Sequence, residues 1–116
     1  MTVERAYSTN GISDKELDRE LDKLWKELWT SGSSLEADAK AAHIDLSKLD
    51  GLTRKQAIEA RREGEGLGVL ATTLVIIFAK ALAPEVAKVV HDLWEKVLLK
   101  RILREKGNKT IVSKNR

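Results

Sequence analysis

The residues of this chain that could do chemistry are few, and they do not form a recognisable set. Only two histidines occur, His43 and His91, and neither belongs to a His-Glu-x-x-His pattern of the kind that holds zinc on a helix. The chain has no cysteine, which excludes a thiolate metal site, a disulfide and a cysteine nucleophile. We therefore predict no metal site and no bound cofactor.

Two further patterns are similar to catalytic motifs but lack their essential parts. The serines at 31, 33 and 34 have no neighbouring base and no nucleophile-elbow sequence, so helix capping and linker roles explain them. The spacing Gly64-x-Gly66-x-Gly68 is similar to a phosphate-binding loop, but no lysine follows it and Glu65 would repel a phosphate. We interpret these glycines as a hinge. No catalytic residues and no small-molecule substrate emerge, and we predict that the protein is not an enzyme.

The basic residues collect at the C-terminal end of the chain. The net charge is +3, but residues 96–116 carry eight Lys or Arg against Glu105 alone, a local +7 that leaves the remainder at −4. Basic ends of this kind contact anionic surfaces, so an anionic membrane is a candidate partner. Nucleic acid is not expected, because no recognition motif is present and the tail has no aromatic residue to stack on bases. The candidate anionic-surface contacts are Lys100, Arg101, Arg104, Lys106 and Lys109.

Helical periodicity and capping signals dominate most of the chain. Ser13 and Glu16 form a capping box before a run of leucines and tryptophans at helical spacing, which predicts an amphipathic helix at about 13–29. Similar signals predict helices at 34–43, extending toward 49, at 54–63 and at 85–105. Residues 1–12 are polar and aperiodic, and we expect a flexible arm there. Residues 110–112 are long enough only for an edge strand.

The segment from Gly66 to Ala79 is fourteen residues without a charge, although 34% of the chain is charged. We expect a helix at about 67–83 that is apolar on all sides and must be enclosed by protein or by lipid. Its length is borderline, because a membrane span needs about 20 apolar residues and a shorter run is typical of a buried core helix. Pro84 can then start the next helix at its first position or kink a continuing one.

These patterns predict an all-α protein of four to five helices, in which one uniformly apolar helix is followed by a basic amphipathic helix. The expected organisation is a flexible arm at 1–12, a helical interaction module at 13–63, the apolar and amphipathic helices at 64–106, and a basic tail at 107–116. The start of the chain does not resemble a cleaved secretion signal, so we expect a cytoplasmic protein or one at the inner face of a membrane.

Two functions fit this organisation. The leading hypothesis is a small non-enzymatic protein that associates with a membrane through residues 66–83, presents an interaction module to a protein partner, and can oligomerise. The alternative is a soluble helical-bundle adaptor or homo-oligomer in which 67–83 is the central core helix. The residues expected to face lipid or core are Leu70, Leu74, Ile77 and Phe78, and the interface candidates are Trp25, Trp29, Trp94 and Leu98.

Overall fold

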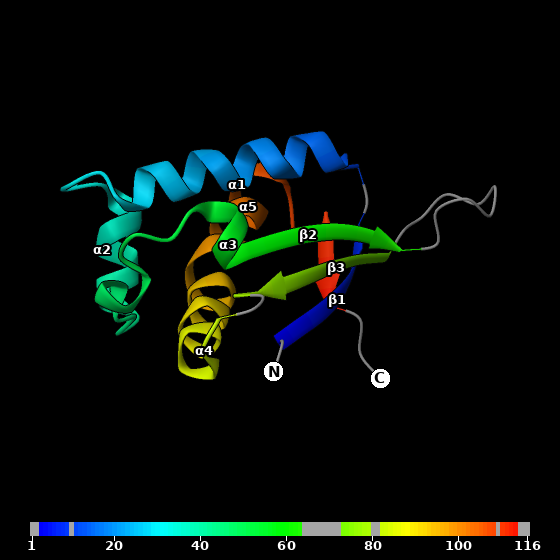
Figure 1. Ribbon diagram of the computed structural model, residues 1–116. Helices are drawn as coiled ribbons and strands as arrows, with labels where there is room; N and C mark the ends of the chain where they lie inside the picture. The colour runs from blue at the N-terminus through cyan, green and yellow to red at the C-terminus, as the bar shows by residue number, and fades with distance from the viewer. Residues whose placement is uncertain (1–2, 10, 64–72, 80–81, 109, 114–116) are drawn as a thin grey trace.

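The computed structural model describes residues 3–9, 11–63, 73–79, 82–108 and 110–113, and its fold is mixed α/β (Figure 1). The prediction of an all-α helical bundle is therefore wrong. In chain order the elements are β1 (Val3–Thr9), α1 (Asp14–Leu28), α2 (Ser34–Ala41), the 3-10 helix η1 (Leu46–Leu49), α3 (Arg54–Ala57), β2 (Ile58–Glu63), β3 (Thr73–Phe78), α4 (Pro84–Leu93), the π-helical segment η2 (Trp94–Leu98), α5 (Leu99–Lys106) and β4 (Ile111–Ser113).

The four strands form one antiparallel sheet in the order β2-β3-β1-β4. β3 is an inner strand, with Leu74 opposite Tyr7 of β1 and Ile76 opposite Ala60 of β2. In Figure 1, α1 runs beside β2 in the opposite direction, and α4 lies to the left of the strands, near the end of β3. The strand order makes β2 and the short strand β4 the two edge strands, and residues 111–112 of the segment 110–112, expected as no more than an edge strand, belong to β4.

The charge-free segment contains strand β3, so the prediction of a helix at 67–83 is wrong over the part that the structure describes. Strand residues alternate between the two faces of a sheet, and a strand covered on both faces is a continuous apolar run. Leu74, Ile76 and Phe78 join the hydrophobic core beneath the helices, whereas Val75 and Ile77 lie on the opposite face and are also buried. Residues 64–72, which include the expected hinge and Leu70, lie outside the described residues.

Within the described part of the chain, no helix combines the length and the apolar character needed to cross a bilayer.

The predicted helix at 54–63 is correct only in its first turn. Thr53 and Gln56 form the expected capping box, with the Thr53 N–H donating to Gln56 Oε1 at 2.9 Å, but α3 ends at Ala57. The next six residues pair with β3 as β2, and Ile58 is fully buried. Pairing with a buried apolar strand thus overrides the helical propensity of the Ala, Arg and Glu residues in this stretch.

The expected flexible arm is also an ordered element, because residues 3–9 form β1 between β3 and β4. Tyr7 explains why the strand is fixed: its side chain is only 2% exposed and its hydroxyl accepts a hydrogen bond from Trp94 Nε1 at 2.8 Å. A polar sequence thus supplies one buried aromatic anchor to the core.

The other helices agree with the sequence patterns. Ser13 Oγ accepts the Glu16 N–H at 3.1 Å, which completes the capping box of α1. α2 begins after Ser33 and ends at Ala41, and the left-handed backbone of His43 (φ 60°) separates it from η1, so the helix does not continue to 49. Pro84 is the first residue of α4, and residues 84–106 are helical throughout, with a π-helical turn at η2.

One hydrophobic core unites these elements. It contains Tyr7 of β1, Leu21 of α1, Phe78 of β3, Trp94 of η2 and Ile111 of β4. Residues from the expected arm, interaction module, apolar segment and tail therefore pack against one another.

Candidate functional site

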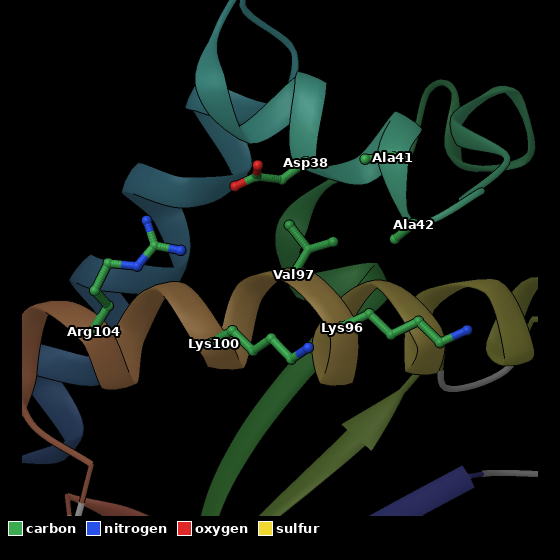
Figure 2. A pocket seen from close by; sticks show the side chains of 7 residues that line it. All are labelled: Asp38, Ala41, Ala42, Lys96, Val97, Lys100 and Arg104. Carbon is green, nitrogen blue, oxygen red and sulfur yellow. The ribbon is translucent and has the colours of Figure 1, made fainter.

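The most distinctive surface feature is a hollow between α2 and the long helix formed by η2 and α5, which we call the basic groove. Its volume is about 310 Å³. Figure 2 shows α2 above the groove and the long helix below it, with Val97 pointing into the space between them. The lining residues are Asp38, Ala41, Ala42, Lys96, Val97, Lys100 and Arg104.

Helical spacing produces the positive charge of the basic groove. Lys96, Lys100 and Arg104 follow one another at intervals of four residues, so they lie along one face of the helix (Figure 2). All three are exposed, and no acidic partner within ion-pair distance is recorded for them among the described residues. These three cations are therefore free to meet an anionic ligand.

The floor of the basic groove is apolar. Val97 is 3% exposed and packs into the core, while Ala41 and Ala42 come from the end of α2. Alanine has only a methyl side chain, so the surface stays concave at this point instead of being filled by a larger residue. The groove thus combines an apolar base with a row of positive charges along one rim.

One arginine beside the groove holds its two walls together. Arg101 Nη1 donates to Glu27 Oε2 of α1 at 3.0 Å, and Nη2 donates to Ser34 Oγ at 2.9 Å and Asp38 Oδ2 at 3.4 Å. Burial alone would lower the pKa of Arg101, but the hydrogen bonds and charges of Glu27 and Asp38 outweigh it and raise the pKa. The charged guanidinium also offsets Asp38, the acidic residue in the groove lining.

The structure separates the five predicted anionic-surface residues. Lys100 and Arg104 line the basic groove, whereas Arg101 is held by α1 and α2. Lys106 is exposed at the end of α5, and Lys109 lies outside the described residues. Only part of the predicted basic surface is therefore brought together in one place.

The predicted interface residues divide in the same way. Trp94 and Leu98 belong to the core, and Trp25 is nearly buried and donates its indole N–H to the Leu52 carbonyl at 3.3 Å. Trp29 remains 40% exposed and stands edge-on to Trp25, with 6.0 Å between the ring centres. The predicted membrane or core residues Leu74, Ile77 and Phe78 are all buried in β3.

Sequence reasoning missed Lys96, Val97, Ala41 and Ala42 as site residues. The interval of four residues from Lys96 to Lys100 and Arg104 was a visible signal of one basic helix face. Nothing in the sequence indicated that two alanines of α2 would lie opposite that face.

A second group of polar side chains joins α1 to α5. Lys23 Nζ lies 3.7 Å from Glu20 Oε1 and 3.5 Å from Glu105 Oε1. Burial is the main cause that raises the pKa of Glu20, and its hydrogen bond with Glu105 adds to this effect. The same hydrogen bond is the main cause that lowers the pKa of Glu105. Glu20 is thus the carboxyl that holds a proton more readily.

In the part of the chain that the structure describes, no group of three His, Cys, Asp or Glu side chains is arranged so that it could hold a metal ion. His91 Nε2 lies 3.0 Å from Glu95 Oε1, and its ring stands edge-on to Phe78 with 5.1 Å between centres. Glu95 lies in turn 3.8 Å from Arg5 of β1. These contacts join α4, η2 and the sheet, and we interpret them as structural.

No protein-family model, curated protein or solved structure matches the chain.

Proposed function

We propose that the protein is a non-enzymatic interaction module that binds an acidic, amphipathic segment of a partner protein in the basic groove. The observation that carries the proposal is the row of Lys96, Lys100 and Arg104 above an apolar floor. Cations elsewhere on these and the neighbouring helices have acidic partners: Lys23 of α1 lies near Glu20 and Glu105, and Arg101 of α5 pairs with Glu27 and Asp38. The unpaired row is therefore available for a ligand.

The shape of the groove favours a protein segment as the ligand. An apolar side chain can enter the hollow and cover Ala42 and Val97, while carboxylates beside it meet the cations on the rim. A helix with glutamates at every fourth position matches the spacing of Lys96, Lys100 and Arg104. A flat anionic surface would meet the charges but leave the floor uncovered.

The expected membrane insertion is no longer part of the proposal. It depended on a helix at 66–83, and residues 73–78 are instead the inner strand β3. Three expectations stay predictions: contact with an anionic membrane, localisation in the cytoplasm or at the inner face of a membrane, and the absence of enzymatic activity. The adaptor alternative remains, on a mixed α/β fold.

The expected affinity is modest. Three exposed ion pairs contribute about 0.2–1 kcal/mol each, and burial of one aliphatic side chain contributes about 1.5–3 kcal/mol. Ordering of the peptide opposes these terms. We expect a dissociation constant of roughly 0.1–10 mM at low ionic strength, rising with added salt.

The proposal is tested by fluorescence anisotropy with a labelled helical peptide of leucines and regularly spaced glutamates. The variant Lys96→Glu/Lys100→Glu/Arg104→Glu should weaken binding by about tenfold or more. The matched control Lys26→Glu/Lys48→Glu/Lys88→Glu changes the net charge equally at exposed positions outside the groove lining, and it should bind nearly as the parent does.

A second variant separates docking from general charge attraction. Ala42→Phe fills the hollow without changing a charge, so it should weaken the peptide by a similar factor. The proposal fails if Ala42→Phe binds like the parent protein, or if the control triple variant loses as much affinity as the groove triple variant.

A further inference from the structure

The edge strand β2 exposes backbone groups in a regular pattern. The Ala79 N–H donates to the Ala57 carbonyl at 2.7 Å, which makes these two residues a hydrogen-bonded antiparallel pair. Because such pairs alternate along a ladder, residues 59, 61 and 63 bond to β3, while 58, 60 and 62 point their N–H and C=O groups away from it. β2 is the outer strand on this side of the sheet.

Arg54 covers one end of this exposed edge. Its side chain is only 6% exposed, its Nη1 donates to the Ile58 carbonyl at 3.2 Å, and its backbone carbonyl accepts the Ile58 N–H. Ala60 is the next residue with outward-facing groups, and no partner for them is recorded among the described residues. An additional strand can therefore pair with β2 about Ala60.

A row of charged residues on α1, which we call the α1 stripe, lies beside Ala60. It consists of Lys15, Asp18, Arg19 and Asp22. Asp18 lines a hollow of about 230 Å³ together with Arg54 and Ala60, and it lines a second hollow of about 340 Å³ with Lys15 and Arg19. α1 and β2 run in opposite directions (Figure 1), and Asp18, near the middle of the α1 stripe, lines the same hollow as Ala60, near the middle of β2.

The charges of both elements are self-complementary under a two-fold axis at Ala60. In β2, Glu59 and Arg61 lie on either side of Ala60, so two antiparallel copies place each Glu59 opposite the other copy's Arg61. The α1 stripe has the order Lys15, Asp18, Arg19, Asp22. When two copies of α1 lie antiparallel, Lys15 of each copy faces Asp22 of the other at both ends, and Asp18 faces Arg19 in the middle.

The aspartates of this stripe keep the capacity for a second partner. Arg54 donates to one carboxylate oxygen of Asp22 at 2.8 Å and to one of Asp18 at 3.3 Å, yet both side chains are more than half exposed. The other register near this point is unfavourable, because centring the pair on Arg61 would oppose two arginines at short range.

We infer that a second copy of this chain binds here, with β2 pairing antiparallel to β2 about Ala60 and α1 lying antiparallel to α1. The dimer joins the two four-stranded sheets through the N–H and C=O groups of both Ala60 residues; Ile58 takes no part in this pairing, because Arg54 already holds its N–H and C=O groups. The occupant is a second copy because the same short sequences supply both halves of each charge pair. This surface is formed by α1 and β2, so it is separate from the basic groove.

The test is the molar mass in solution, measured by light scattering and sedimentation equilibrium against the 13.0-kDa mass of one chain. We expect twice that mass to appear within the range of about 10–500 µM that suits a small interface. Arg61→Glu places glutamate opposite Glu59 twice, and it should raise the dimer dissociation constant by about tenfold or more.

The charge-swapped variant Glu59→Arg/Arg61→Glu restores opposite charges across the axis, and its dissociation constant should return to within about threefold of the parent value. Lys48→Glu in η1 is the matched control and should leave dimerisation unchanged. Circular dichroism checks that each variant is folded. A chain that stays monomeric over the whole concentration range overturns the inference. So does Arg61→Glu dimerising like the parent, or a swapped variant that stays as weak as Arg61→Glu.

Discussion

The hydrogen bond between Trp94 and Tyr7 offers a sharp test of how β1 is attached to the fold. Trp94 Nε1 donates to Tyr7 Oη at 2.8 Å, both side chains are buried, and the rings meet edge-on at 5.9 Å. Tyr7→Phe keeps the ring and removes the hydroxyl, which accepts the Trp94 N–H. A buried N–H without a partner destabilises a protein by about 1–3 kcal/mol, so we expect a loss of this size in the free energy of unfolding.

The loss of stability in Tyr7→Phe should be measurable and should not change with pH between about 5 and 8. Burial raises the pKa of Tyr7 above its usual 10.0, so the phenol stays neutral between pH about 5 and 8. Urea unfolding followed by circular dichroism gives the free energy, and a thermal scan should show a decrease of about 3–6 °C per kcal/mol.

A double-mutant cycle with Trp94→Phe separates the hydrogen bond from packing. Once the indole N–H is absent, Tyr7→Phe should destabilise the protein by at least about 1 kcal/mol less than it does in the parent. The reasoning is refuted if Tyr7→Phe changes the parent by less than about 0.3 kcal/mol, or if the two substitutions are additive.

Three further predictions concern other contacts. Arg101→Ala should lower the free energy of unfolding by about 1.5–3 kcal/mol in urea titrations, because the guanidinium joins α5 to α1 and α2; a loss below about 0.5 kcal/mol would contradict this. Ile76→Ala should destabilise the protein by about 3–5 kcal/mol and Ile77→Ala by less, since only Ile76 belongs to the core cluster; equal losses would contradict the alternation. The pKa of Glu20 in the folded protein is raised above its usual 4.5. The stabilisation by protonated Glu20 is therefore complete below pH 4.5 and is lost as the pH rises through the folded-state pKa. The Glu20→Gln side chain does not ionise but can still donate a hydrogen bond to Glu105. The free energy of unfolding of this variant, measured relative to the parent at each pH, should therefore increase from pH about 4 to 7. A difference that stays constant with pH would contradict this linkage.

The helices with local signals were predictable from the sequence. Ser13 with Glu16 and Thr53 with Gln56 mark helix starts through contacts three residues apart, and both capping boxes are present. Pro84 marks the start of α4 for the same local reason, since its missing N–H has no intrahelical partner at that position.

The sheet was not predictable by the same means, because its signals are non-local. Leu74 to Phe78 is a short apolar run, and periodicity alone does not separate a buried strand from a buried helix. The consecutive β-branched residues Val75, Ile76 and Ile77 were the visible sign of a strand. The partners that decide the matter lie far away in the chain, as the pairing of Leu74 with Tyr7 illustrates.

The site was predictable only in its charge. The excess of Lys and Arg after residue 96 identified Lys100 and Arg104 as surface cations. It also included Arg101, whose partner Glu27 is 74 residues away, so only the folded structure removes this arginine from the available set. The apolar floor depends on the way α2 crosses the long helix, which no local pattern specifies.

The most direct test of the proposed function is a titration of the protein with the acidic amphipathic peptide, followed by amide chemical shifts in NMR spectra. The account predicts saturable shifts that concentrate at Ala41, Ala42, Val97 and Lys100, with the strands unaffected. Shifts that spread over exposed lysines outside the groove, such as Lys26 and Lys88, would contradict the account, as would the absence of any shift at a peptide concentration of about 1 mM.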